Sequence, residues 1–80
     1  MNHVVYIARG PRGALRIGRG GCGGKGPHRS YRLVYFESFA VLGDAISRER
    51  QLKGWQRDWQ VDLVERVNPG WRDLTGTLCA

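Results

Sequence analysis

The chain has few features that would tie it to a membrane or a disulfide framework. Its 80 residues include only two cysteines, Cys22 and Cys79, which form no closely spaced ligand pair. We therefore treat both as free thiols. No apolar run approaches the length of a membrane span, and the start Met1-Asn2-His3 lacks the charged and apolar regions of a signal peptide. We expect a cytoplasmic protein with no membrane partner.

Internal repeats and linkers are also absent, so residues 1–80 are predicted to form a single domain. The composition, with 41% hydrophobic and 25% charged residues, is that of a globular protein and excludes a chain that is disordered over its whole length. A chain of this length lies near the lower limit at which a core without disulfides supports a fold. Three tryptophans supply large area for burial.

Acidic residues are almost missing from the first half of the chain. Residues 1–40 carry seven lysines and arginines but only one acidic residue, Glu37, whereas residues 41–80 are balanced. The net charge of +6 therefore belongs to the first half, which favours one basic face and a polyanionic partner. We expect nucleic acid, with DNA ahead of RNA, and the candidate contacts are Arg9, Arg12, Arg16, Arg19 and Arg32. Lys53 is a further candidate that could equally be solvated.

The hydrophobic pattern changes from a period of two to a period near 3.6 at about Val41. This predicts an α/β (α+β) fold with strands over 3–8, 14–18 and 31–37, followed by helices over 41–53 and 55–67. A turn-rich connector at residues 10–13 predicts a hairpin. Both alternating sets of the first strand are mostly apolar, so both faces of the sheet should be covered. The second helix is expected to turn one face to the core, formed by Trp55, Trp59, Leu63 and Val67; Trp71 and Leu74 should fold back onto it.

A glycine-rich segment over 19–29 separates the second and third strands. It contains Gly18-x-Gly20-x-x-Gly23, but no helix follows to hold a pyrophosphate, so a dinucleotide site is excluded. A phosphate-binding P-loop is excluded because Gly26 follows Lys25 where serine or threonine is required. We expect a mobile basic loop, since ordering so many glycines is entropically costly.

Glu49 interrupts an apolar helical stripe. The non-polar residues Leu42, Ala45, Ile46 and Leu52 have the spacing of a core-facing helix, and Glu49 lies in their middle. A partly buried carboxylate is costly unless it is paired or holds a cation. Two interpretations stay open: Glu49 pairs with a neighbouring or distant basic residue, or it is a metal ligand facing a cleft.

Three stretches of the second half carry a family resemblance: Arg32 to Glu37, Ala45 to Trp55, and Val67 to Leu74. Together with Tyr6 and Ile17-Gly18, they resemble the GIY-YIG nuclease superfamily, in particular the small stand-alone bacterial proteins of that family. The resemblance implies a three-stranded antiparallel sheet flanked by helices. It also implies hydrolysis of a phosphodiester that depends on Mg²⁺ or Mn²⁺.

The resemblance assigns roles to individual residues. Glu49 falls at the family's metal-binding glutamate and Tyr6 at a tyrosine that helps to activate the attacking water. A phenol with a pKa near 10 is a poor base at neutral pH unless a cation or hydrogen bonds favour its ionised form. Arg16 occupies the place of the second motif tyrosine and is the other candidate catalytic residue. Asn68 is a further candidate, for a polar active-site residue seen in some relatives.

The chain also departs from the family pattern. The helix that carries an arginine for the phosphoryl charge is expected to be replaced by the glycine-rich segment, with Gly26 at the arginine position. Arg19, His28 or Arg29 could take its place from a loop. We therefore expect a monomeric nucleic-acid-binding protein whose metal-dependent hydrolysis is weak or lost. The alternatives are a fully active Mg²⁺-dependent DNA endonuclease and a non-catalytic protein-interaction remnant.

Overall fold

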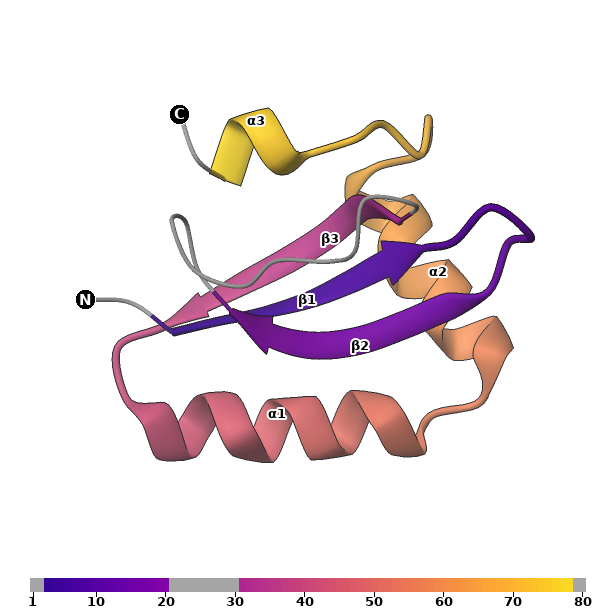
Figure 1. Ribbon diagram of the computed structural model, residues 1–80. Coiled ribbons are helices and arrows are strands. Elements are labelled where there is room, and N and C mark those ends of the chain that lie inside the picture. Colours follow the sequence, from indigo (N-terminus) through magenta and orange to yellow (C-terminus); the bar gives the residue numbers. More distant parts are fainter. Residues whose placement is uncertain (1–2, 21–30, 79–80) are drawn as a thin grey trace.

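A three-stranded antiparallel sheet forms the centre of the protein (Figure 1). The computed structural model describes residues 3–20 and 31–78. The elements in chain order are β1 (His3–Arg9), β2 (Leu15–Gly20), β3 (Arg32–Phe39), α1 (Leu42–Gly54), α2 (Arg57–Val67) and α3 (Thr75–Leu78). The α+β fold predicted from the change of period is confirmed. The boundaries differ from the prediction by at most two residues, and the short α3 is an addition.

β1 is the central strand, because the strand order is β2-β1-β3. Ile7 lies opposite Ile17 on one neighbour and Tyr35 on the other. Val4, Val5, Ile7 and Ala8 are all buried, so apolar side chains of β1 are covered on both faces as predicted. α1 lies on one side of the sheet and α3 on the other (Figure 1).

The β1–β2 turn fixes one end of the sheet. Its backbone closes through a hydrogen bond from the Gly10 N–H to the Ala14 carbonyl at 2.8 Å. Gly13 has φ of +80°, a conformation that glycine adopts without steric cost. Gly10 lies against the Tyr31 ring, where an added Cβ would come within 2.9 Å of Cε2. Arg57 of α2 donates a hydrogen bond of 2.7 Å to the Gly13 carbonyl and so joins α2 to this turn.

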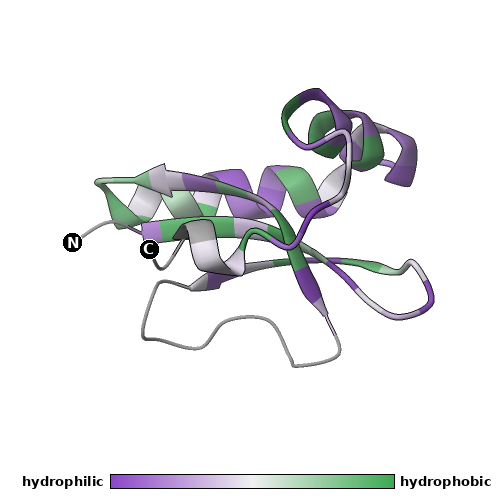
Figure 2. Ribbon diagram, turned by 90° about the horizontal axis from the view of Figure 1, so that it is seen from above, coloured by the Kyte–Doolittle hydropathy of each residue, from purple (hydrophilic) through white to green (hydrophobic). Residues whose placement is uncertain are grey.

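Hydrophilic and hydrophobic residues alternate around α1 and α2 (Figure 2). α1 buries Ala45 and Leu52 against the sheet, and α2 buries Val64. The predicted core face of α2 is partly wrong, because the side chains of Trp59 and Val67 are 58% and 64% exposed. The helix begins only at Arg57, and the residue turned to the sheet is Val64, which was not in the predicted stripe. Trp55, Leu63 and Trp71 do pack against the core.

β2 extends two residues further than predicted, into the glycine-rich segment. Arg19 and Gly20 are the last residues of β2, paired with Val5 and Val4, so the expectation of a loop from residue 19 is wrong. The expectations for Cys22, Lys25, Gly26, His28 and Arg29, including the replacement of the arginine-bearing helix, lie outside the described residues. Within residues 3–20 and 31–78, no helix is long and apolar enough to cross a membrane.

Candidate functional site

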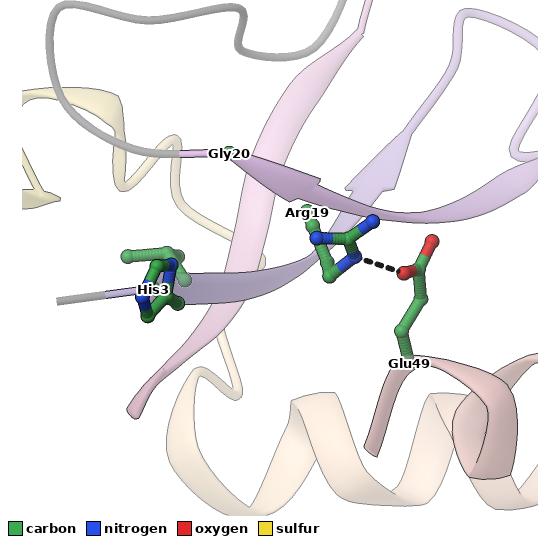
Figure 3. A pocket seen from close by; sticks show the side chains of 5 residues that line it. His3, Arg19, Gly20 and Glu49 are labelled. Carbon is green, nitrogen blue, oxygen red and sulfur yellow. Dashed lines mark hydrogen bonds and ion pairs between the residues drawn. The ribbon is translucent and has the colours of Figure 1, made fainter. Parts of the chain in front are cut away.

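Glu49 lines a pocket of about 340 Å³ between α1 and the end of β2 (Figure 3). The other lining residues are His3, Val4, Arg19 and Gly20. In Figure 3 the Arg19 side chain points from β2 toward the Glu49 carboxylate on α1. We call this cavity the Glu49 pocket.

Two cations hold the Glu49 carboxylate. Arg19 Nε lies 2.5 Å from Oε1, and Lys53 Nζ lies 2.8 Å from Oε2. Only 15% of the Glu49 side chain is exposed. Burial alone would raise the pKa of this carboxyl, but the hydrogen bonds from Lys53 and Arg19 outweigh it, and the pKa lies below its ordinary value. The paired interpretation of Glu49 is therefore what the structure shows, with one partner nearby in α1 and the other on β2.

Arg19 comes from a regular strand and not from a loop, which corrects the sequence-based expectation. It lies two residues after Ile17, so strand alternation turns both side chains to the face of the sheet that α1 covers. This signal was present in the sequence, because residues 15, 17 and 19 form one period-two set. The glycines on both sides of Arg19 hide this signal, because they make it look like part of the glycine-rich segment.

Tyr6 lies on the other face of the sheet, opposite Gly18. A Cβ at Gly18 would lie 2.7 Å from the Tyr6 Oη, so the tyrosine ring extends across β2 in space that only a glycine leaves open. β2 is an edge strand, with Arg19 and Glu49 on its α1 side. The structure therefore places Tyr6 and Glu49 on opposite faces of the same edge strand and does not bring their side chains together on one face.

Arginines gather at the end of the sheet that carries the β1–β2 turn. Arg9 ends β1, Arg32 pairs with it at the start of β3, Arg12 lies in the turn, and Arg16 lies near the start of β2. Arg57 joins them through its bond to the turn. All five are exposed, and we call Arg9, Arg12, Arg16, Arg32 and Arg57 the turn-end arginine cluster.

This placement corrects the expectation of one basic face. Arg9 and Arg16 point to opposite faces of the sheet, because Arg9 pairs with Leu15, the neighbour of Arg16. Their guanidinium groups lie 5.5 Å from the Trp71 ring and 5.4 Å from the Tyr31 ring, respectively. Arg19 lies at the end of β2 away from the turn and is held, with Lys53, at Glu49. The cluster thus shares an end of the sheet and not a face.

A second polar network was not found from the sequence. Arg48 donates to both oxygens of Glu37, at 2.9 Å from Nε and 3.0 Å from Nη2, and the Tyr35 hydroxyl donates to the same carboxylate. The Arg48 guanidinium also lies 5.3 Å from the centre of the Trp55 ring. Burial would raise the pKa of Glu37, but hydrogen bonds from Arg48 and Tyr35 lower it below its ordinary value. The network joins β3 to α1.

Tyr35 is expected to make stability depend on alkaline pH. Burial and the bond to Glu37 raise its pKa from 10.0 to about 12. Because the folded state holds the phenol proton more tightly, this contribution is complete below pH 10.0 and is lost as pH rises through about 12. Urea unfolding across this range should show a steeper loss of stability in the wild type than in Tyr35→Phe. Equal pH dependence in the two proteins would contradict the assignment.

Asn68 is a buried connector and not an exposed polar residue of a cleft. Its amide nitrogen donates to the Val34 carbonyl at 3.0 Å and to the Arg72 carbonyl at 2.9 Å, and its amide oxygen accepts from the Arg72 N–H at 3.0 Å. Only 6% of the residue is exposed. One donor hydrogen is used on the Val34 carbonyl of β3 and the other on the Arg72 carbonyl of the segment after α2, so the geometry gives Asn68 a structural role and does not support an active-site role.

The described residues do not form a ready metal site. Among residues 3–20 and 31–78 there is no group of three or more histidine, cysteine, aspartate and glutamate side chains that could hold a metal ion. In this part of the chain Glu49 is the only carboxylate lining its pocket, and each of its oxygens is held by a cation. Magnesium bound by a single protein carboxylate needs water and substrate phosphate for its remaining ligands. The donor set therefore does not fit a preformed magnesium site.

Comparison with solved structures shows the same fold in another protein. The chain is similar over its full length to the solution NMR structure of the UPF0213 protein BH0048 from Bacillus halodurans, also over the full length of that chain, with 23% identity and a TM-score of 0.69. No family model and no curated protein matches the sequence significantly. The likeness to the UPF0213 protein confirms the α+β fold.

Proposed function

We propose that this protein binds nucleic acid on a GIY-YIG-like fold, and that metal-dependent phosphodiester hydrolysis is weak or lost. The observation that carries the proposal is the turn-end arginine cluster. Five exposed guanidinium groups lie around one turn, and the acidic neighbour Asp73 lies beside one of them, Arg32. Arginine donates to phosphate oxygens through a planar fork and keeps its charge at every physiological pH.

Weak or lost hydrolysis is supported by the state of Glu49. In the GIY-YIG nucleases that the sequence resembles, the equivalent glutamate holds the metal. Here, Arg19 and Lys53 neutralise it, and displacing them would cost the two ion pairs. Tyr6 lies across β2 from Glu49, so the phenol and the carboxylate are on opposite faces of the sheet. Removing one electrostatic stabiliser from a catalytic site typically lowers rates by orders of magnitude.

The Glu49 pocket offers a direct test. Glu49→Gln should strengthen binding to duplex DNA several-fold without added metal, because Arg19 and Lys53 lose the carboxylate that neutralises them and become available to phosphate. The slope of log K against log salt should steepen by about 0.9 for each additional phosphate that the protein neutralises. Fluorescence anisotropy with a labelled duplex measures both quantities.

Glu65→Gln is the matched control, since it removes the same charge from an exposed position of α2. Its effect on affinity should be smaller than that of Glu49→Gln, and its salt slope should stay at the wild-type value. Two results would instead support a metal-binding carboxylate and overturn this part of the proposal: Glu49→Gln binds DNA more weakly than the wild type, and added Mg²⁺ strengthens binding by the wild type but not by Glu49→Gln.

The second candidate function is a fully active Mg²⁺-dependent DNA endonuclease. The observation in its favour is that Tyr6 and Glu49 flank one edge strand, so a phosphodiester lying along β2 could contact both. Incubation of supercoiled plasmid with Mg²⁺ or Mn²⁺, beside Glu49→Ala, separates the two functions. Rapid cleavage that is lost in Glu49→Ala would favour the nuclease; intact plasmid together with salt-dependent binding would favour the binding protein. Intact plasmid with no binding would favour the protein-interaction remnant.

A further inference from the structure

Trp59 is largely exposed, although a small core gains most from burying its tryptophans. Trp55 and Trp71 pack against the core cluster, whereas Trp59 leaves 58% of its surface open. Full burial of a large aromatic ring is a main source of stability in a chain of this size. An exposed indole face is free to stack on another flat ring.

The rings of the two neighbouring tryptophans form a corner. The rings of Trp55 and Trp59 meet edge to face, with centroids 6.0 Å apart and an angle of 82°. The Arg48 guanidinium lies over the Trp55 ring, 5.3 Å from its centroid, and Arg48 is itself held by Glu37. A pocket of about 280 Å³ lies at this corner. A flat ring could stack on one indole while its edge meets the other.

The rest of the pocket adds hydrogen-bonding groups to the aromatic walls. Its lining includes Asp62, Leu63 and Arg66, all from α2. Asp62 and Arg66 form an exposed ion pair of 3.0 Å, one turn apart on the helix. The carboxylate accepts hydrogen bonds and the guanidinium donates them, so together they complement an edge that carries both donors and acceptors. Nucleobase edges have this character.

We propose that this pocket, lined by Trp55, Trp59, Asp62, Leu63 and Arg66, binds one unpaired nucleobase of a single-stranded segment. The inference rests on the proposed nucleic-acid binding and adds to it a preference for unpaired bases. An aliphatic side chain of a protein partner would use the indole surface but would form no hydrogen bond with Asp62 or Arg66. The net charge of +6 also draws a polyanion toward the protein.

The test uses a short single-stranded DNA of mixed sequence and the blunt duplex made from it. Trp59→Ala should weaken single-strand binding by about tenfold, the range found when one stacking side chain is removed, and leave duplex binding unchanged. Trp59→Phe should keep most of the affinity, because a smaller aromatic face remains. Quenching of tryptophan fluorescence on single-strand binding should fall sharply in Trp59→Phe.

Val67→Ala is the matched control, since Val67 is another exposed apolar residue of α2 and does not line the pocket; its affinities should equal those of the wild type. If the wild type binds both DNAs and Trp59→Ala does so equally well, this inference fails while the proposed function stands. If the wild type binds neither at low salt, both fail. If sedimentation shows a dimer that Trp59→Ala disrupts, with unchanged single-strand affinity, the surface belongs to a second copy of the chain and the inference is overturned.

Discussion

Asn68→Ala is expected to lower the free energy of unfolding by about 3 kcal/mol. The substitution would leave the carbonyls of Val34 and Arg72 and the N–H of Arg72 without the partners they have in the folded protein. A buried polar group without a hydrogen bond typically costs about 1 to 3 kcal/mol. The backbone carbonyl of Asn68 also accepts a hydrogen bond of 3.0 Å from the N–H of Trp71, a non-glycine residue with φ of +53°; alanine keeps this carbonyl, so the expected loss comes from the side chain alone.

This loss is large for so small a protein, because a domain of this length has a total stability of roughly 4 to 12 kcal/mol. The Tm should fall by roughly 12 to 24 °C in a thermal melt followed by circular dichroism. Asp73→Ala is the control, because it removes an exposed side-chain contact to the Thr75 N–H in the same C-terminal segment; it should cost less than about 1 kcal/mol. Equal melting of Asn68→Ala and the control would show that the connector contributes little.

The fold could be predicted because apolar residues recur with a period of two in its strands and near 3.6 in its helices. β1 is apolar on both alternating sets and proves to be the central strand, with Val5 and Ile7 toward α1 and Val4 and Ala8 on the other side. The carboxylate of Glu49 could be located for the same reason, since it broke an otherwise apolar helical stripe. In both cases the signal is local, and the neighbours in the sequence define it.

The partners of these residues could not be predicted, because they depend on register and packing. The resemblance singled out Asn68 as a candidate active-site residue, but the sequence could not show that its side chain bonds the Val34 carbonyl of β3. Trp59 has the spacing of a core residue, but α2 packs on the core through Val64 instead. Arg48, a sequence neighbour of Glu49, pairs with Glu37 on the third strand.

The position of the positive charges on the surface likewise could not be predicted from the sequence alone. Composition predicted a basic first half, and strand alternation then divides its arginines between two faces and two ends of the sheet. At one end Arg19 is neutralised by Glu49, and at the other the turn-end arginine cluster stays exposed. Of these two groups the second adds more positive potential, so long-range attraction of a polyanion should be directed to the β1–β2 turn.

Replacing Arg9, Arg12, Arg16 and Arg32 together by glutamine should therefore weaken duplex DNA binding at low salt by about 100-fold or more. In the wild type, three to five neutralised phosphates would give a slope of log K against log salt of roughly −3 to −4.5. Each phosphate that the variant no longer neutralises should reduce the magnitude of this slope by about 0.9. Anisotropy titrations over a range of salt concentrations measure the slope. A wild-type affinity that does not change with salt would rule out this mode of binding.

A charge-matched pair of variants separates position from net charge. Arg12→Gln combined with Arg16→Gln removes two positive charges from the turn, and Arg50→Glu removes the same net charge from an exposed position of α1. Because a phosphate contact acts over a few ångströms while the field of the whole molecule is screened within about 10 Å at 0.1 M salt, the turn variant should lose about tenfold or more in affinity and the α1 variant much less. Equal losses would mean that the arginines act only through net charge, and the turn would not be the interface.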